Sequence, residues 1–155
     1  IGGAESRHRG IELNMVYSFN EAWRLNVAAS YASHTYEGSV SATGVNLAGL
    51  DIDTAPRFTG SAQLNWIISD ERSVELELVH MDSYYTDEAN TAEYDGHDLV
   101  NLRYQAKLNQ NWYYGARITN LLDTDYAERA DYAFGNERYF VGEPRSLYVS
   151  VGRRF

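Results

Sequence analysis

The sequence predicts an all-β protein, an antiparallel up-and-down transmembrane β-barrel or a part of one, and three observations support this prediction. Apolar and polar residues alternate with period two along most of the chain. The connections between the alternating segments are short and long in turn. Aromatic residues make up 14% of the chain and 13 of its residues are Tyr, which is high for a water-soluble domain and ordinary for a barrel with aromatic girdles.

Seven segments carry the alternation. In the first, Ile11 and Leu13 fall on one face and Glu12 and Asn14 on the other. Most segments approach the ~9–11 residues that a membrane-spanning strand requires, whereas no apolar run approaches the ~18 residues of a transmembrane helix. The predicted strands are residues 11–19, 23–31, 58–66, 74–78, 100–108, 112–119 and 147–151.

The connections divide into two kinds. Tight turns are expected near residues 20, 70 and 110, and two of them have similar sequences, FNEAW and LNQNW. Long polar loops are expected at 38–55, 86–96 and 121–143. Because the two kinds alternate, all tight turns should lie at one end of the sheet and all long loops at the other, as in outer-membrane barrels.

The two faces of the predicted strands differ in chemistry. A soluble sandwich can show the same alternation, but aromatics at the tight-turn end of the apolar face favour a membrane. These aromatics are Tyr17, Phe19, Trp23, Trp66, Trp112, Tyr114 and Phe155. The polar face carries Glu12, Arg24, Gln63, Asn65, Glu75, Glu77, Arg103, Lys107 and Arg117. Arg103 and Arg117 are expected to pair with carboxylates of a plug or of the wall, such as Glu75 or Glu77.

Several classes of function are disfavoured. The net charge of −9 argues against nucleic acid as a partner, and the absence of Cys excludes disulfides and thiolate metal sites. The four His residues show no metal-ligand spacing, and no nucleophile or phosphate-loop motif occurs. We therefore expect no catalytic residues, metal or cofactor. Asp51, Asp53, Asp123 and Asp125 offer too few oxygens for calcium, and Asp123 is better explained as a turn residue.

The C-terminal stretch resembles a known family. Residues 114–126, YGARITNLLDTDY, resemble the penultimate-strand signature of TonB-dependent receptors, and Gly142-Glu143-Pro144-Arg145 resembles their entry to the final strand. The terminal aromatic Phe155 resembles the one that the assembly machinery of the outer membrane reads. Arg9-Gly10-Ile11-Glu12 resembles a strand opening that recurs in these receptors.

The resemblance implies a location and partners. Residues 1–155 would be about the last seven strands of a barrel of about 22 strands, and the start at Ile1-Gly2-Gly3-Ala4 is also expected of a portion. The barrel would lie in outer-membrane lipid of a Gram-negative bacterium. The partners would be an N-terminal plug, the remaining strands, the TonB complex acting through the missing N-terminal region, and a ferric siderophore. Cobalamin, haem and oligosaccharides remain open as ligands.

The long loops are rich in aromatics and Arg. Tyr rings supply rigid amphipathic contacts and Arg supplies bidentate contacts to anionic groups, so these side chains are candidates for substrate binding. The alternative is that they pack the loops against one another. The candidates are Tyr84 and Tyr85 near the second loop, Tyr94 within it, and Arg129, Tyr132, Arg138 and Tyr139 in the third.

Two other functions are compared with a transporter. A small stand-alone barrel, serving as an adhesin or a structural anchor, would require an eighth strand. Residues 126–140 would supply it only if 132–134 paired with 139–141 around a turn at Gly135-Asn136. A barrel enzyme would require a nucleophile, a base and an acid that converge, and the sequence offers no such spacing.

Overall fold

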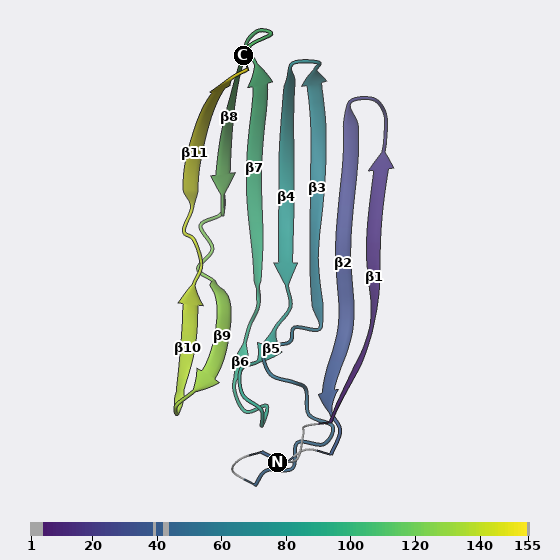
Figure 1. Ribbon diagram of the computed structural model, residues 1–155, viewed down its shortest axis with the longest axis vertical. Helices are drawn as coiled ribbons and strands as arrows, with labels where there is room; N and C mark the ends of the chain where they lie inside the picture. The colour runs from purple at the N-terminus through teal and green to yellow at the C-terminus, as the bar shows by residue number, and fades with distance from the viewer. Residues whose placement is uncertain (1–4, 39, 42–43, 155) are drawn as a thin grey trace.

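A seven-stranded antiparallel sheet forms the body of the protein (Figure 1). The computed structural model describes residues 5–38, 40–41 and 44–154, so Phe155 and the first four residues lie outside the described part. Each strand pairs with the next long strand in the chain, in the order β1-β2-β3-β4-β7-β8-β11. The strands are β1 (Ser6–Ser18), β2 (Trp23–Tyr36), β3 (Phe58–Ser69), β4 (Arg72–Met81), β7 (His97–Lys107), β8 (Trp112–Thr119) and β11 (Ser146–Arg153).

All seven predicted strands are confirmed, and so is the arrangement of their connections. The tight turns lie at the top of Figure 1 and the long loops at the bottom. Asn20 accepts hydrogen bonds from the backbone N–H groups of Ala22 and Trp23 at 2.8 and 2.9 Å. Asn109 does the same for Asn111 and Trp112 at 2.9 and 3.0 Å. The similar sequences of these two turns therefore form the same Asn-capped structure.

The register of the sheet separates an apolar face from a polar one. Cross-strand partners connect one apolar row across all seven strands: Tyr17, Leu25, Leu64, Leu76, Leu102, Ile118 and Leu147. Many large apolar side chains on this face are exposed, with Ile11 at 75% and Val149 at 72%, and others are partly buried. Such a wide exposed apolar surface suits lipid and not water.

Two small hairpins occupy the long loops. One joins β5 (Tyr84–Tyr85) to β6 (Glu93–Tyr94), and the other joins β9 (Ala127–Ala133) to β10 (Asn136–Val141). Each is a separate two-stranded sheet. The β9–β10 hairpin therefore does not add an eighth strand to the described sheet.

The turn of the β9–β10 hairpin was predicted one residue too late. Phe134 and Gly135 form it, with φ of 54° and 81°, and Asn136 already pairs with Ala133. A two-residue hairpin turn of this kind needs positive φ at both positions. Phe rarely adopts that conformation, so the Gly135-Asn136 pair gave the stronger signal in the sequence.

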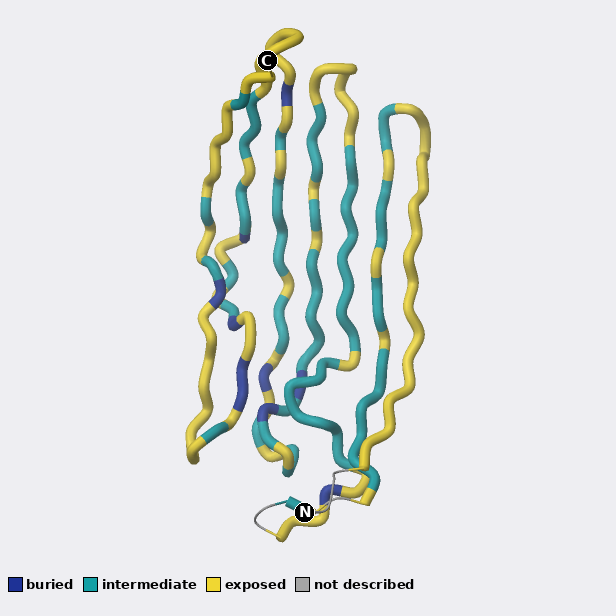
Figure 2. The backbone as a smooth tube through the Cα atoms, viewed as in Figure 1, coloured by how far each residue is buried: buried dark blue, intermediate teal, exposed yellow. Residues whose placement is uncertain are grey.

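Most buried residues lie at the long-loop end and not within the sheet (Figure 2). A cluster there contains Tyr84, Tyr94, Ala127 and Ala130, with Met81 packed against it. A single-layer sheet has no second layer to bury a core, so the loops provide the only such cluster in the described residues. Among these residues, no helix has the length and apolar character to cross a membrane.

Candidate ligand-binding surface at the long-loop end

The long loops that follow β2 and β4 are joined by backbone and side-chain hydrogen bonds. The backbone N–H of Thr54 donates to the carbonyl of Tyr85 at 2.8 Å. Asn90 donates to the carbonyl of Asp51 at 2.9 Å and accepts from the N–H of Asp51 at 2.8 Å. These reciprocal contacts fix one loop against the other, so the two loops form one surface.

The loop between β5 and β6 is shaped by Asp87. Its carboxylate accepts 2.8 Å hydrogen bonds from the backbone N–H groups of Thr91 and Ala92 and from the Thr91 hydroxyl. Burial alone would raise the pKa of Asp87, but these hydrogen bonds outweigh it and lower the pKa. The loop is therefore held closed by a charged carboxylate.

Tyr84 and Tyr94 hold β9 in place through their hydroxyl groups. The Tyr84 hydroxyl accepts from the N–H of Ala130 at 2.7 Å and donates to its carbonyl at 3.2 Å. The Tyr94 hydroxyl makes the same two contacts with Ala127, at 3.0 and 3.2 Å. With 6% and 9% exposure, the two rings expose little surface, so their geometry agrees with the loop-packing alternative.

Two of the predicted arginines meet at one buried carboxylate. Arg138 donates from Nε to Asp131 Oδ1 at 2.6 Å, and Arg129 Nη2 lies 2.9 Å from Oδ2. The second contact is an ion pair only, because Oδ2 receives no hydrogen bond of good geometry from the described residues. The hydrogen bond from Arg138 and the charge of both guanidinium groups lower the pKa of Asp131. One negative charge thus orients two positive charges.

Two phenylalanine rings of the β9–β10 hairpin lie beside this arginine pair. The guanidinium of Arg138 lies 6.0 Å from the rings of Phe134 and Phe140, and that of Arg129 lies 5.9 Å from Phe140. Phe134 is 94% exposed. The hairpin therefore presents cations and aromatic faces together, a combination that recognises anionic and aromatic ligands.

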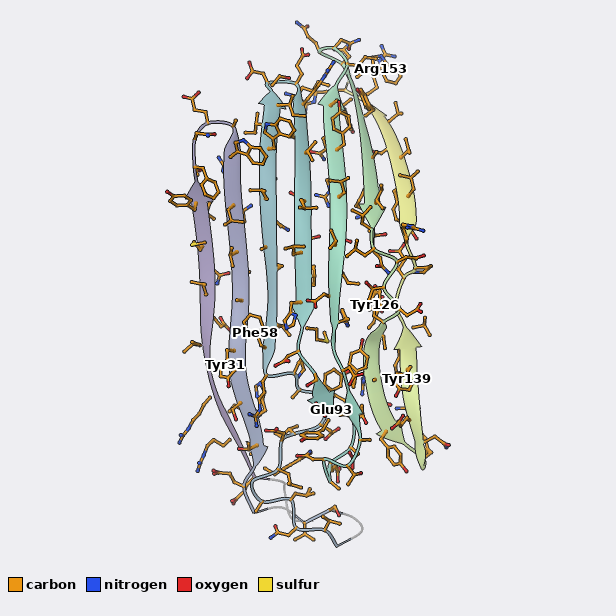
Figure 3. The ribbon with its side chains drawn as sticks, turned by 180° about the vertical axis from the view of Figure 1, so that it is seen from behind. Tyr31, Phe58, Glu93, Tyr126, Tyr139 and Arg153 are labelled. Atoms are coloured by element: carbon orange, nitrogen blue, oxygen red, sulfur yellow. The ribbon has the colours of Figure 1, made fainter. Side chains whose placement is uncertain are left out.

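The remaining candidates differ in their exposure. Tyr132 and Tyr139 are about half exposed, and Tyr139 lies on β10 (Figure 3), where its hydroxyl donates to Glu137 at 2.8 Å. Tyr85 is partly buried, and its carbonyl is used by Thr54. Of the seven candidates, Arg129, Tyr132, Arg138 and Tyr139 thus lie on one hairpin. The register places the two arginines on one face of it and the two tyrosines on the other.

A hollow of about 310 Å³ opens where the three long loops converge. It contains Tyr84 and Arg129 of the seven candidates, together with residues that the sequence did not single out. Asp131 was missed as well, although its position between two arginines was a usable signal. The lining residues are Thr54, Pro56, Met81, Tyr84, Glu128 and Arg129.

The polar face of the sheet carries a hydrogen-bonded network. Arg103 pairs with Glu75 at 3.3 Å, as predicted. Arg117 does not pair with Glu75 or Glu77; its guanidinium stacks over the Tyr148 ring at 4.7 Å. The register gives one reason, because Arg103 lies between Arg117 and Glu75. In addition, Glu77 already accepts from two amides on its neighbouring strands. These donors are Gln63 at 2.8 Å and Asn101 at 2.9 Å.

The two C-terminal sequence motifs contact each other in space. Asn120, 2% exposed, donates to the carbonyls of Thr124 and Glu143 at 2.8 and 3.1 Å. Asp123 has a φ of 57° and accepts a 3.0 Å hydrogen bond from the backbone of Arg145. Asp123 is therefore a turn residue, as predicted, and it joins the end of β8 to the start of β11.

The acidic pair Asp51 and Asp53 is also engaged within the protein. Arg57 donates to both carboxylate oxygens of Asp51 at 2.8 Å, and Asp53 accepts from the Tyr36 hydroxyl at 3.0 Å. In the described part of the chain, no three His, Cys, Asp or Glu residues gather as a potential metal site.

Comparisons with known proteins agree with this architecture. A family model described as TonB dependent receptor-like, beta-barrel matches residues 1–121. The siderophore receptor PiuA from Acinetobacter baumannii is 19% identical, with a TM-score of 0.80 over 97% of this chain and 22% of that one. The ferric yersiniabactin uptake receptor FyuA from Yersinia pestis is 13% identical, with a TM-score of 0.81 over 98% and 24%. The copper transporter OprC is 15% identical, with a TM-score of 0.74 over 97% and 24%.

At these identities the likeness is one of fold. The chain spans about a fifth to a quarter of the length of these three proteins. No curated protein sequence matches the chain.

Proposed function

Because this chain belongs to the TonB-dependent receptor β-barrel family, we propose that it is a portion of a transporter that takes up a scarce nutrient such as a ferric siderophore. Its sheet is part of a barrel wall in the outer membrane of a Gram-negative bacterium. The family and the fold are those of receptors and transporters, so the chain is not an enzyme.

The observation that carries the ligand proposal is the arginine pair on the β9–β10 hairpin. Arg129 and Arg138 share one carboxylate, so the group keeps a net positive charge beside exposed aromatic rings. Ferric catecholate and hydroxamate complexes present anionic oxygens that such a group would bind. Tyr132 and Tyr139 would contact a ligand only from the opposite face of the hairpin, while Tyr84, Tyr85 and Tyr94 would act by positioning the hairpin.

The rest of the transporter would surround this portion. We place residues 1–155 in the C-terminal part of a barrel of about 22 strands. A plug would contact the polar face, where a hollow of about 500 Å³ near the tight turns includes Gln105, Lys107 and Tyr113. The TonB complex would act on the plug side. A stand-alone anchor or adhesin is less well supported, because β1 and β11 are the two ends of the described sheet and do not pair.

The test uses the receptor that contains this chain, purified in detergent micelles. Removing both guanidinium groups with R129A/R138A deletes charge-assisted contacts of about 1.5–3 kcal/mol each, so the affinity for the cognate ligand should fall at least about tenfold. Binding of ferric catecholate, hydroxamate and citrate complexes is measured by quenching of intrinsic fluorescence. R154A, at the tight-turn end, is the matched control. Equal affinities of R129A/R138A and the unmodified receptor for every bound complex would contradict the proposal.

A further inference from the structure

Two histidines face each other across the first hairpin of the sheet. His8 on β1 and His34 on β2 are direct cross-strand partners. Their Nδ1 atoms lie 2.7 Å apart and their ring centroids 5.0 Å apart. By the alternation of the strands both side chains lie on the polar face, the face that carries Glu12 and Ser30.

The contact between the two rings is a hydrogen bond between imidazoles. One Nδ1 must donate a proton and the other must offer a lone pair, so at least one of the two imidazoles is neutral. The Ser6 hydroxyl lies 3.0 Å from Nε2 of His8. His8 is exposed and His34 partly buried, so solvent and ions reach the pair from the polar side.

The spacing of the two nitrogens is close to that of two ligands of one metal ion. Imidazole binds such ions at ~2.0–2.1 Å, which separates two neighbouring ligands by about 2.9 Å at a right angle and about 3.4 Å at the tetrahedral angle. The separation at a right angle exceeds the observed 2.7 Å between the two Nδ1 atoms by a few tenths of an ångström. Square-planar or tetragonal coordination, typical of Cu²⁺ and Ni²⁺, therefore needs the smallest movement of the rings.

We infer that His8 and His34 form a two-imidazole binding site for a divalent transition-metal ion, with Cu²⁺ bound most tightly. Deprotonated Nδ1 atoms of both rings coordinate the ion in place of the shared proton. Imidazole suits copper, nickel and zinc, and copper binds most tightly of these to a given nitrogen site. With two protein ligands the other coordination positions stay open to water or to a second ligand.

The other two histidines of the chain lack this arrangement. His80 is on the apolar face and its Nδ1 contacts the carboxylate of Asp98 at 2.7 Å. His97 uses Nδ1 to contact the Tyr94 hydroxyl at 2.9 Å. Each is paired with an oxygen group and not with a second imidazole, so H80A is a matched control.

The site is separate from the loop surface proposed for the nutrient. It lies on the β1–β2 hairpin, whereas Arg129 and Arg138 lie on β9–β10. Metal binding by the histidines can therefore fail while ligand binding by the arginines holds, and the reverse.

The experiment titrates Cu²⁺ into the intact receptor, without a histidine tag, in detergent micelles, with glycine as a competing chelator. Calorimetry gives the affinity, and electron paramagnetic resonance gives the number of coordinated nitrogens. H8A and H34A should each lower the affinity for Cu²⁺ by at least about 10–100-fold, because losing a residue that only orients a metal ligand already costs this much. Each variant should also lose one nitrogen coupling from the spectrum. H80A should leave both readouts unchanged.

Resistance to heat on gel electrophoresis establishes that each variant is folded. The double variant H8A/H34A should lose the site entirely. Copper affinity and spectra identical to those of the unmodified receptor in H8A/H34A would overturn the inference. An equal loss in H80A and H8A would overturn it too, because it would show binding without preference for the facing pair.

Discussion

Replacement of Tyr84 by Phe tests whether the loops are held by the hydroxyl groups described above. The ring remains, but both contacts to Ala130 are lost. Ala130 is 1% exposed, so its N–H and carbonyl would have no water to replace the hydroxyl. Leaving a buried polar group unpaired costs about 1–3 kcal/mol, and we expect Y84F to destabilise the docking of β9 by about 2–3 kcal/mol.

That free energy corresponds to an opening equilibrium about 30–150 times larger. Hydrogen–deuterium exchange of the intact receptor measures it directly, because the Ala130 amide donates to Tyr84 and peptides covering β9 should exchange faster by this factor. The main sheet should be unaffected, since its ladders do not involve Tyr84. Y132F is the matched control, because that ring is half exposed. Unchanged exchange of β9 in Y84F would refute the reasoning.

Three further predictions concern the loop end. N120A should destabilise the receptor by about 2–4 kcal/mol, since a buried amide with several hydrogen bonds is lost, and thermal unfolding measures this; a loss below 1 kcal/mol would contradict it. G142A should lower the unfolding temperature, because a Cβ there would lie 2.2 Å from the Tyr126 ring, and the double variant G142A/Y126A should recover part of the loss. The pKa of Asp131 is lowered, so its carboxylate stabilises the β9–β10 hairpin fully above the ordinary pKa of Asp. This stabilisation is lost as the pH falls through the lowered pKa. Exchange of β9 should accelerate only below about pH 4, and D131N should abolish this acid step.

The strands and their two faces were predictable because their signal is local. A period of two within a segment fixes which side chains share a face, and the apolar row from Leu25 through Leu64 to Leu76 follows from it. The bounds of most strands differed from the prediction, whereas β8 begins and ends at the predicted residues 112 and 119. The segment predicted at 74–78 extends to Arg72–Met81, because His80 interrupts the apolar pattern while the backbone pairing continues.

The roles of the loop tyrosines were not predictable. Tyr84 and Tyr139 look alike in the sequence, since both lie in or next to a polar loop and near other aromatic residues. What separates them is a contact between Tyr84 and Ala130, 46 residues along the chain, and no periodic pattern encodes that distance. A composition argument can therefore find the loop surface but cannot divide it into residues that bind and residues that hold the loops together.

The histidine pair is intermediate between the strands, which were predictable, and the loop tyrosines, which were not. In the β1–β2 hairpin, partners run from Ser18↔Arg24 to Ser6↔Tyr36 without a shift in register. Once the turn at Asn20 is fixed, every partner follows by counting outward, and His8 must lie opposite His34. The contact between the two histidines was thus encoded in the sequence, but it is found only when the strand register is used to predict long-range contacts. Counting outward from a well-defined tight turn finds sites that a search for close spacing along the chain overlooks.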